Sequence, residues 1–322
     1  MKTFKRAAAL LLTLLLLLGT AACATTATGS DKIKVVTTIF PIYDWVREVA
    51  GDDDCVEVTL LLDNGVDLHS YSPTADDIVK IASCDLFLYV GGESDKWVDD
   101  ALKEATNKDM KVIGLMDTLG DALREEELKE GMQAEEEEEE EEGPEYDEHV
   151  WLSLKNAAVL CERIGAALGE VDREHASDYA ANAAAYINKV KTLDGQYADA
   201  VAAARCKTLL FADRFPFRYL VEDYGLDYFA AFIGCSAESE ASFETMIFLA
   251  KKVDELGLRA ILQTESADGS IARTVRENTA AKDQTVLTLD SLQSVTKEKV
   301  AQGVTYLSVM EKNLDVLKDA LK

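Results

Sequence analysis

Residues 33–39 read IKVVTTI, a run rich in β-branched apolar residues that predicts a buried strand. Further short apolar runs follow at residues 56–62 (VEVTLLL), 85–91 (DLFLYVG) and 111–115 (KVIGL). Amphipathic stretches between these runs predict helices, as at residues 75–82 and 95–105. Strands that alternate with helices in this way predict an α/β fold with a parallel sheet.

The same alternation returns in the second half of the chain. Four strands are predicted, at residues 208–212, 227–233, 259–264 and 285–289. Two helices are predicted, at residues 243–256 and 271–278. We therefore expect two lobes, each a mostly parallel sheet flanked by helices.

The two lobes are expected to be joined by one long helix. Between residues 173 and 204, apolar residues from Tyr179 to Val201 step by three or four positions, as on the buried face of a helix. The segment contains no proline and one glycine, Gly195. We therefore expect a rigid strut rather than a loose hinge.

The length of 322 residues also favours about two lobes, because a single core seldom grows so large. We expect a signal peptide at residues 1–23 and an N-terminal lobe at 31–170, which includes an acidic loop at 125–143. A connecting helix at 171–204 and a C-terminal lobe at 205–322 are expected to follow.

The composition is that of a strongly acidic globular protein. Lys and Arg total 33 residues against 60 for Asp and Glu, which gives a formal net charge of −27, and 48% of the residues are hydrophobic. The hydrophobic share excludes wholesale disorder and a multi-span membrane protein. A negative field of this size repels a phosphate backbone, so it excludes nucleic-acid binding and instead attracts cations.

The N-terminus predicts export. Three basic residues among the first six precede an apolar run at residues 7–18, which is too short to span a membrane but suits a secretory signal. The sequence GTAAC at residues 19–23 resembles the lipobox at which bacterial lipoproteins are cleaved and acylated, with Thr20 where leucine is usual. We therefore expect a lipid on Cys23 that anchors the protein to the cell membrane. The alternative is ordinary signal cleavage with an incidental cysteine.

The chain has six cysteines. If Cys23 carries lipid, five remain, so at least one thiol stays free or pairs with another chain. None of the six lies in a C-x-x-C pattern, which leaves a zinc ribbon or a redox motif unsupported. We expect most of them to be small buried hydrophobic residues.

One low-complexity segment, residues 125–143, contains eight consecutive glutamates at positions 135–142. Like charges repel one another, so the simplest prediction is a solvated, disordered loop. The functional alternative is a weak collector of cations placed shortly before His149.

Only three histidines are present, and their contexts differ. His175 lies in a polar stretch that begins a helix, so we expect it to face solvent. His69 follows the second predicted strand, at the end where parallel sheets present ligand-binding loops, and His149 follows the acidic segment. His69 and His149 are candidate metal ligands, and the alternative for each is a hydrogen-bonded histidine in a loop.

Acidic partners for such a site lie in the second lobe. Glu265 follows the predicted strand at residues 259–264, and Asp290 follows the one at 285–289, so both stand at carboxyl ends. Zinc takes imidazole nitrogen together with carboxylate oxygen. A site between the lobes would combine the two histidines with Asp290 and Glu265. The alternative for each acid taken alone is a solvated turn residue.

These segments resemble those of the solute-binding proteins of zinc and manganese ABC importers, from about residue 34 to the C-terminus. Residues 65–73, GVDLHSYSP, are similar to the family's G-x-D-x-H-x-Y-x-P element with a ligand histidine. Residues 148–152, EHVWL, are similar to its P-H-V-W-L element, with Glu148 in place of proline. Residues 288–292, TLDSL, resemble the late segment whose aspartate is a ligand, and Glu265 falls on a family glutamate close to the site.

The chain departs from this pattern at the third ligand segment. Family members have histidine or glutamate about ten residues before a Tyr-Gly pair, whereas this chain has Arg214 ahead of the pair at residues 224–225. Arginine stays protonated and does not coordinate a cation. We expect Arg214 to form a salt bridge with Asp290 or Glu265, and its replacement by histidine to tighten zinc binding. Asp213 is an alternative oxygen ligand or, more simply, a surface or turn aspartate.

The resemblance implies a binding protein rather than an enzyme. It would capture a divalent transition metal as its transported ligand, zinc in preference to manganese, outside the cytoplasm and deliver it as a monomer to a membrane permease. One alternative is a secreted metallohydrolase, although the chain contains no H-E-x-x-H motif. Another is a binding protein for an anionic or chelated ligand, which Arg214 would attract.

Overall fold

The computed structural model describes residues 32–51, 55–133, 145–236 and 240–322, and Ile33–Lys322 form one compact unit. The predicted signal peptide, Cys23 and the glutamate run at 135–142 lie outside the described residues. Among the described helices, none combines the length and the apolar composition that crossing a membrane requires.

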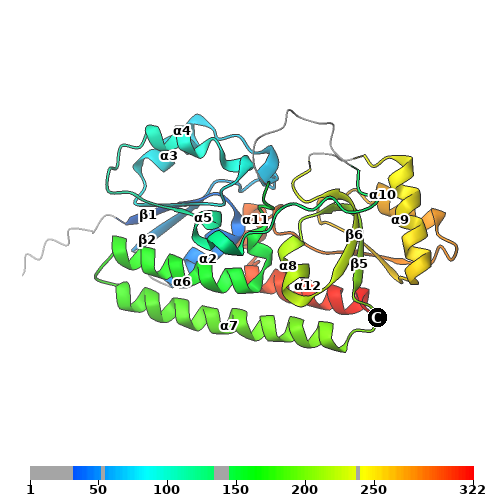
Figure 1. The fold of residues 1–322 in the computed structure, drawn as a ribbon. Helices are drawn as coiled ribbons and strands as arrows, with labels where there is room; N and C mark the ends of the chain where they lie inside the picture. Colours follow the sequence, from blue (N-terminus) through cyan, green and yellow to red (C-terminus); the bar gives the residue numbers. More distant parts are fainter. Residues whose placement is uncertain (1–31, 52–54, 134–144, 237–239) are drawn as a thin grey trace, which may run out of the picture. The chain divides into compact units, whose positions relative to one another are not determined.

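The first sheet has four parallel strands in the order β2-β1-β3-β4. They are β1 (Ile33–Thr37), β2 (Val56–Leu60), β3 (Leu86–Tyr89) and β4 (Lys111–Gly114). The helices of this half lie on its two sides (Figure 1), and they are α2 (Phe40–Ala50), α3 (Ala75–Ser83), α4 (Val98–Lys103), α5 (Leu115–Leu119) and α6 (Leu154–Val171). Val35 and Phe87 are fully buried between these layers, which explains why the strands are apolar on both faces.

Short 3-10 turns occur in the loops of the first half. They are η1 (Leu68–Ser70), η2 (Glu93–Asp95), η3 (Gly120–Ala122) and η4 (Val150–Leu152). Two of them, η1 and η4, carry or directly follow the candidate histidines.

The second sheet is also parallel, in the order β6-β5-β7-β8. Its strands and helices are β5 (Thr208–Phe215), β6 (Asp227–Ile233), β7 (Ala260–Gln263) and β8 (Thr285–Thr288), with α8 (Arg218–Tyr224), α9 (Phe243–Leu256), α10 (Ser270–Asn278), α11 (Lys297–Ala301) and α12 (Tyr306–Ala320). The predicted α/β class with two parallel sheets is therefore confirmed. The register of β5 shifts between Phe211 and Arg214, and such irregularities redirect side chains next to functional sites.

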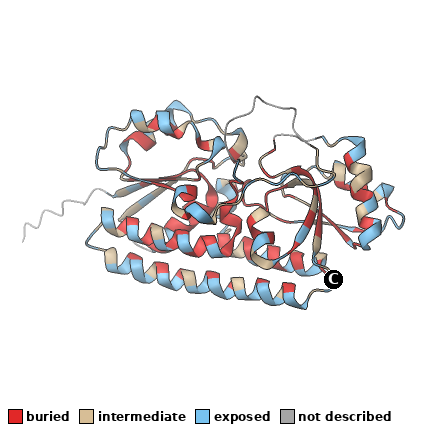
Figure 2. Ribbon diagram, viewed as in Figure 1, coloured by how far each residue is buried: buried red, intermediate tan, exposed pale blue. Residues whose placement is uncertain are grey.

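One uninterrupted helix, α7 (Ala176–Ala203), lies between the two sheets in the chain. Its buried residues are those whose spacing predicted it, and Figure 2 shows its opposite face exposed. The helix is packed along its length rather than free, because α6, α2 and α12 contact it. Tyr197, for example, donates its hydroxyl to the Met310 carbonyl at 2.6 Å.

The C-terminal helix α12 packs against elements of the first half. The Tyr306 backbone N–H donates to Asp44 Oδ2 at 2.8 Å, and the Tyr306 hydroxyl donates to the Trp151 carbonyl at 2.7 Å. Tyr306 is fully buried beside Trp45, with the two rings in a T-shaped arrangement. The core therefore contains residues from both halves of the chain. The lobe boundaries predicted at 31–170 and 205–322 stay a prediction.

The described part of the acidic segment, residues 125–133, is not the free solvated loop that its composition predicted. The Gln133 backbone N–H donates to the Ala231 carbonyl of β6 at 2.9 Å. Gly131 lies so close to Phe248 that a Cβ atom there would be 2.0 Å from the ring. The prediction was wrong for this part because backbone hydrogen bonds and packing hold it against the second sheet. We call residues 125–133 the stem.

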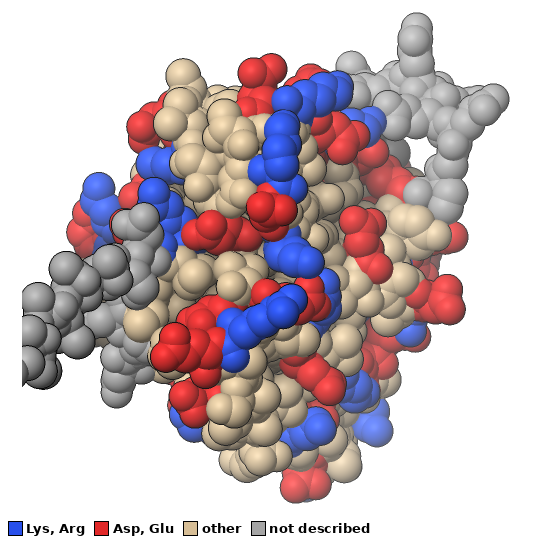
Figure 3. Space-filling model, turned by 90° about the vertical axis from the view of Figure 1, so that its left-hand side faces the viewer, with Lys and Arg blue, Asp and Glu red and all other residues tan. Residues whose placement is uncertain are grey.

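Charges of both signs are mixed on the surface drawn in Figure 3. Lys and Arg side chains lie next to Asp and Glu side chains there, and the coloured part of this face shows no broad basic patch.

Candidate metal centre

His69 lies in η1, on the loop that leaves the carboxyl end of the first sheet. Asp67 caps this turn, and its Oδ1 accepts the His69 backbone N–H at 3.0 Å. The His69 Nδ1 lies 2.8 Å from Ser94 Oγ and 3.5 Å from Glu148 Oε2. These contacts of Nδ1 fix the orientation of the ring.

His149 immediately precedes η4 and is fully buried. Asp147 Oδ1 accepts the His149 backbone N–H at 2.8 Å and lies 3.1 Å from its Nδ1. Tyr219 of α8 donates its hydroxyl to the Asp147 carbonyl at 2.7 Å. A helix of the second half therefore holds the turn that presents His149.

The two histidines meet at their Nε2 atoms, which lie 3.1 Å apart. Two nitrogen ligands of a tetrahedral zinc ion, with bonds of about 2.0 Å, are separated by about 3.3 Å. Each ring also has a hydrogen-bond partner at Nδ1, as metal-binding histidines generally do. The structure thus brings together the two histidines that the sequence singled out.

Cys235, directly after β6, approaches the same point. Its Sγ and one nitrogen of each histidine all lie within 4.8 Å of one another. Its backbone N–H donates at 3.1 Å to Oε1 of Glu126, which belongs to the stem. Sequence reasoning missed Cys235 because it classed the cysteines as buried hydrophobic residues. Its place two residues after the predicted strand at 227–233, at a carboxyl end, was the available signal.

Gln293 was also missed. Its Nε2 lies 3.2 Å from His149 Nε2, and its buried Oε1 has no hydrogen-bond partner. The preceding residue, Leu292, has a φ of 65°, which is uncommon for a residue other than glycine. A strained turn therefore holds an amide beside the histidines. The signal for Gln293 was its position directly after the TLDSL segment, three residues beyond Asp290.

The structure does not bring the carboxylates of Glu265 and Asp290 into the cluster of the two histidines and Cys235. The Glu265 carboxylate accepts the Ser291 backbone N–H at 2.7 Å and the Ser291 hydroxyl at 3.0 Å. Asp290 Oδ1 accepts the Leu292 backbone N–H at 2.8 Å. Both carboxylates accept hydrogen bonds from this turn, so they shape the turn that presents Gln293.

Arg214 forms a salt bridge, but its partner is Asp67 rather than Asp290 or Glu265. The Arg214 Nη2 lies 2.9 Å from Asp67 Oδ2, and Nη1 donates to the Ser236 carbonyl at 3.2 Å. The expected partner was wrong because the Asp67 carboxylate lies within salt-bridge distance of the guanidinium, whereas the carboxylates of Glu265 and Asp290 accept hydrogen bonds from the turn at residues 291–292. The guanidinium thereby links the loop that carries His69 to the backbone next to Cys235.

Asp213, the alternative oxygen ligand, and His175, which was expected to face solvent, lie outside the cluster. Asp213 Oδ2 accepts the Thr264 backbone N–H at 2.8 Å and the Thr264 hydroxyl at 2.6 Å, so it holds β5 to the residue after β7. His175 stands at the start of α7 with its Nδ1 2.7 Å from Asp172 Oδ2, and its side chain is 30% exposed.

Burial governs the ionisation of the site. It lowers the pKa of His149 to about 4, so the imidazole is neutral and keeps a lone pair to offer at neutral pH. Burial also raises the pKa of Asp147 to about 8 and that of Glu148 to about 7. Burial, with the charges of Asp147 and Glu126, raises the thiol pKa of Cys235 well above its usual value. A cation placed among these groups would offset the cost of ionising them.

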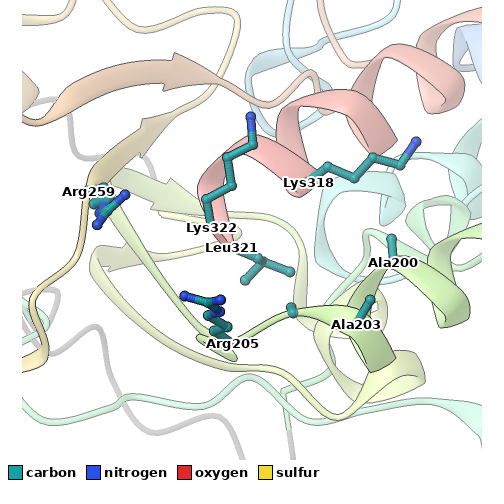
Figure 4. A pocket seen from close by; sticks show the side chains of 8 residues that line it. Ala200, Ala203, Arg205, Arg259, Lys318, Leu321 and Lys322 are labelled. Carbon is teal, nitrogen blue, oxygen red and sulfur yellow. The ribbon is translucent and has the colours of Figure 1, made fainter.

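A cavity of about 620 Å³ lies elsewhere, at the C-terminal end of α12 (Figure 4). Its charged lining residues are all basic, namely Arg205, Arg259, Lys318 and Lys322. The side chains that line it include no carboxylate, imidazole or thiol, so this cavity does not compete with the histidine cluster as a cation site.

The family model described as zinc-uptake complex component A, periplasmic, matches residues 35–320 of this chain. The zinc-binding lipoprotein AdcA of Streptococcus pneumoniae strain R6 is 34% identical over 313 residues, which cover 96% of this chain and 60% of AdcA. The zinc-binding protein AdcA of Streptococcus pyogenes serotype M18 is 31% identical over 293 residues, which cover 89% of this chain and 56% of that protein. The chain therefore spans little more than half the length of these AdcA relatives.

A relative of matching length is the high-affinity zinc uptake system protein ZnuA of Bacillus subtilis, which is 30% identical over 99% of this chain and 98% of its own. Among solved structures, the Zn(II)-bound ZnuA-like domain of S. pneumoniae AdcA is similar with a TM-score of 0.71 and 33% identity, covering 90% of this chain and 99% of that domain. The metal-dependent lipoprotein YcdH of B. subtilis is similar with a TM-score of 0.74 and 28% identity, covering 90% and 99%.

Proposed function

Because the chain belongs to the family of the periplasmic zinc-uptake complex component A, we propose that it captures a zinc ion outside the cytoplasm and delivers it to the permease of an ABC importer. The observation that carries the proposal is the 3.1 Å approach of the His69 and His149 Nε2 atoms at a buried point. His149 is neutral at neutral pH, and the Nδ1 atoms of both rings already have hydrogen-bond partners, so the two Nε2 atoms are left to face a metal ion.

In this proposal His69 and His149 are zinc ligands, and the protein acts as a monomer. Asp290 and Glu265 support the site through the turn that presents Gln293 and through their negative charge. Zinc is favoured over manganese because nitrogen and sulfur side chains converge on the site, whereas manganese prefers oxygen ligands.

The two alternatives have less support. A secreted metallohydrolase is not favoured by a family of uptake components. An anionic or chelated ligand would need a positive group to hold it, but the Arg214 guanidinium is already bonded to Asp67 and to the Ser236 carbonyl.

The test is metal content followed by titration. Protein purified without chelators should contain zinc on elemental analysis, and competition against a chelator of known affinity should give one tight zinc site per chain. The zinc-loaded protein should not hydrolyse a panel of esters and peptides. A protein that binds no zinc in the competition experiment would refute the proposal.

We further propose that the mature protein is anchored to the membrane through a lipid on Cys23, since a relative is itself named a lipoprotein. In a bacterial host that processes lipoproteins, the wild-type protein should fractionate with membranes and Cys23→Ala should be released. Both should bind zinc equally after solubilisation. An intact-mass measurement that finds no acyl chain on the membrane-fraction protein would contradict this prediction.

A further inference from the structure

We propose that Cys235 binds the zinc ion as a thiolate and supplies the ligand that Arg214, at the family's third ligand position, does not. The inference rests on the proposed function and deepens it, because it adds a sulfur to the donor set. Two nitrogens and one sulfur form a set that selects zinc against manganese.

The geometry of the cluster carries the proposal. The Cys235 Sγ and a nitrogen of each of His69 and His149 lie within 4.8 Å of one another. In a tetrahedral zinc site, with a Zn–S bond of about 2.3 Å and a Zn–N bond of about 2.0 Å, sulfur and nitrogen are separated by roughly 3.6 Å. Because 4.8 Å is the upper limit of these separations, the sulfur has to approach the nitrogens by no more than about 1 Å.

The backbone before Cys235 is built to come this close. A Cβ atom on Gly234 would lie 3.1 Å from His149 Cε1, 3.0 Å from Asp147 Oδ2 and 2.9 Å from the Phe215 carbonyl oxygen. Only glycine therefore fits there without displacing the chain. The absence of a side chain at Gly234 lets the end of β6 lie directly against the His149 ring.

Further contacts hold Cys235 in position from both sides. Glu126 of the stem accepts its backbone N–H at 3.1 Å, and Arg214 donates to the carbonyl of the next residue, Ser236, at 3.2 Å.

Two buried polar atoms beside the cluster independently indicate a ligand. Gln293 Oε1 and Asp147 Oδ2 have no hydrogen-bond partner, although the two side chains are 8% and 0% exposed. Buried polar atoms are nearly always paired. Both residues contact His149, so an ion bound at its Nε2 would supply the missing positive charge nearby.

The binding step balances as an exchange of a proton for a metal ion. The Cys235 thiol is protonated in the free protein, because burial and the nearby acidic groups disfavour the thiolate. When zinc binds, the S–Zn bond forms, the S–H bond breaks and the proton passes to solvent, without any change of oxidation state.

Cobalt substitution tests the proposal, because a cobalt–thiolate bond absorbs in the near ultraviolet and a cobalt–imidazole bond does not. We expect this absorption in the Co(II)-loaded wild type and in Cys206→Ser, a matched control whose partly buried sulfur bonds to the Thr208 carbonyl outside the cluster. Cys235→Ser should lack the absorption and should bind zinc about tenfold or more weakly in chelator competition. Its preference for zinc over manganese should also fall.

A second measurement needs no variant. Zinc should protect Cys235 of the wild-type protein against alkylation, which peptide mass spectrometry can follow. The extent of alkylation at Cys206 should be the same with and without zinc. If the wild type binds zinc and cobalt without thiolate absorption and without protection of Cys235, the sulfur ligand is refuted while the proposed function stands. If the wild type binds neither metal, the proposed function itself fails.

Discussion

His69→Ala and His149→Ala are each expected to weaken zinc binding roughly a hundredfold or more, about 2.8 kcal/mol. The two Nε2 atoms lie 3.1 Å apart at the centre of the proposed site. The chain has only one other histidine, His175, which lies outside the cluster, so no third imidazole can replace either one.

The matched control is His175→Ala, which should leave zinc affinity unchanged. Calorimetric titration or chelator competition gives the ranking of the three variants. Because His149 is fully buried, His149→Gln and thermal unfolding of each variant separate lost coordination from lost folding. Equal zinc affinities in folded His69→Ala, His149→Gln and His175→Ala would remove the proposed site.

Arg214→Ala should weaken zinc binding by about thirtyfold, which corresponds to about 2 kcal/mol for the loss of a charged hydrogen bond in a half-buried site. Burial by itself raises the pKa of Asp67, but the charges of Arg214 and His69 hold it below its usual value. Without the guanidinium, the Asp67 carboxylate loses its partner, and the tether to the Ser236 carbonyl is lost as well. The loops that carry His69 and Cys235 then become more flexible.

Arg214→His distinguishes between two expectations, one based on the sequence and one based on the structure. Family resemblance predicts that a histidine at this position adds a ligand and tightens zinc binding. The contacts in the structure predict weaker binding, because an imidazole does not replace both bonds of the guanidinium.

Arg214→Lys keeps the charge and should retain part of the affinity, and Arg205→Ala, on the exposed surface, is the control for loss of an arginine. Chelator competition on all four variants measures the zinc affinities and decides whether Arg214 strengthens or weakens zinc binding. Tighter binding by Arg214→His would show that Arg214 restricts the site instead of organising it.

Local patterns in the sequence were sufficient to predict most strands. The run at residues 227–233 coincides with β6, and the helix predicted at 243–256 coincides with α9, because apolar periodicity and turn residues act over a few positions. The strand at 208–212 was predicted too short, since β5 runs to Phe215 through an irregular register that no apolar pattern marks. The stem was predicted as solvated because the contacts that order it come from β6 and α9, about a hundred residues away.

The sequence by itself determined the α/β class, the two histidines and the family resemblance, because each depends on residue types at short, fixed spacings. Only the tertiary structure decided which groups accompany His69 and His149. Residues 69, 149, 235 and 293 converge through the packing of loops from two sheets, and spacing along the chain contains no information about such distances. The same reason explains Arg214, whose role depends on Asp67, 147 residues away in sequence and 2.9 Å away in space.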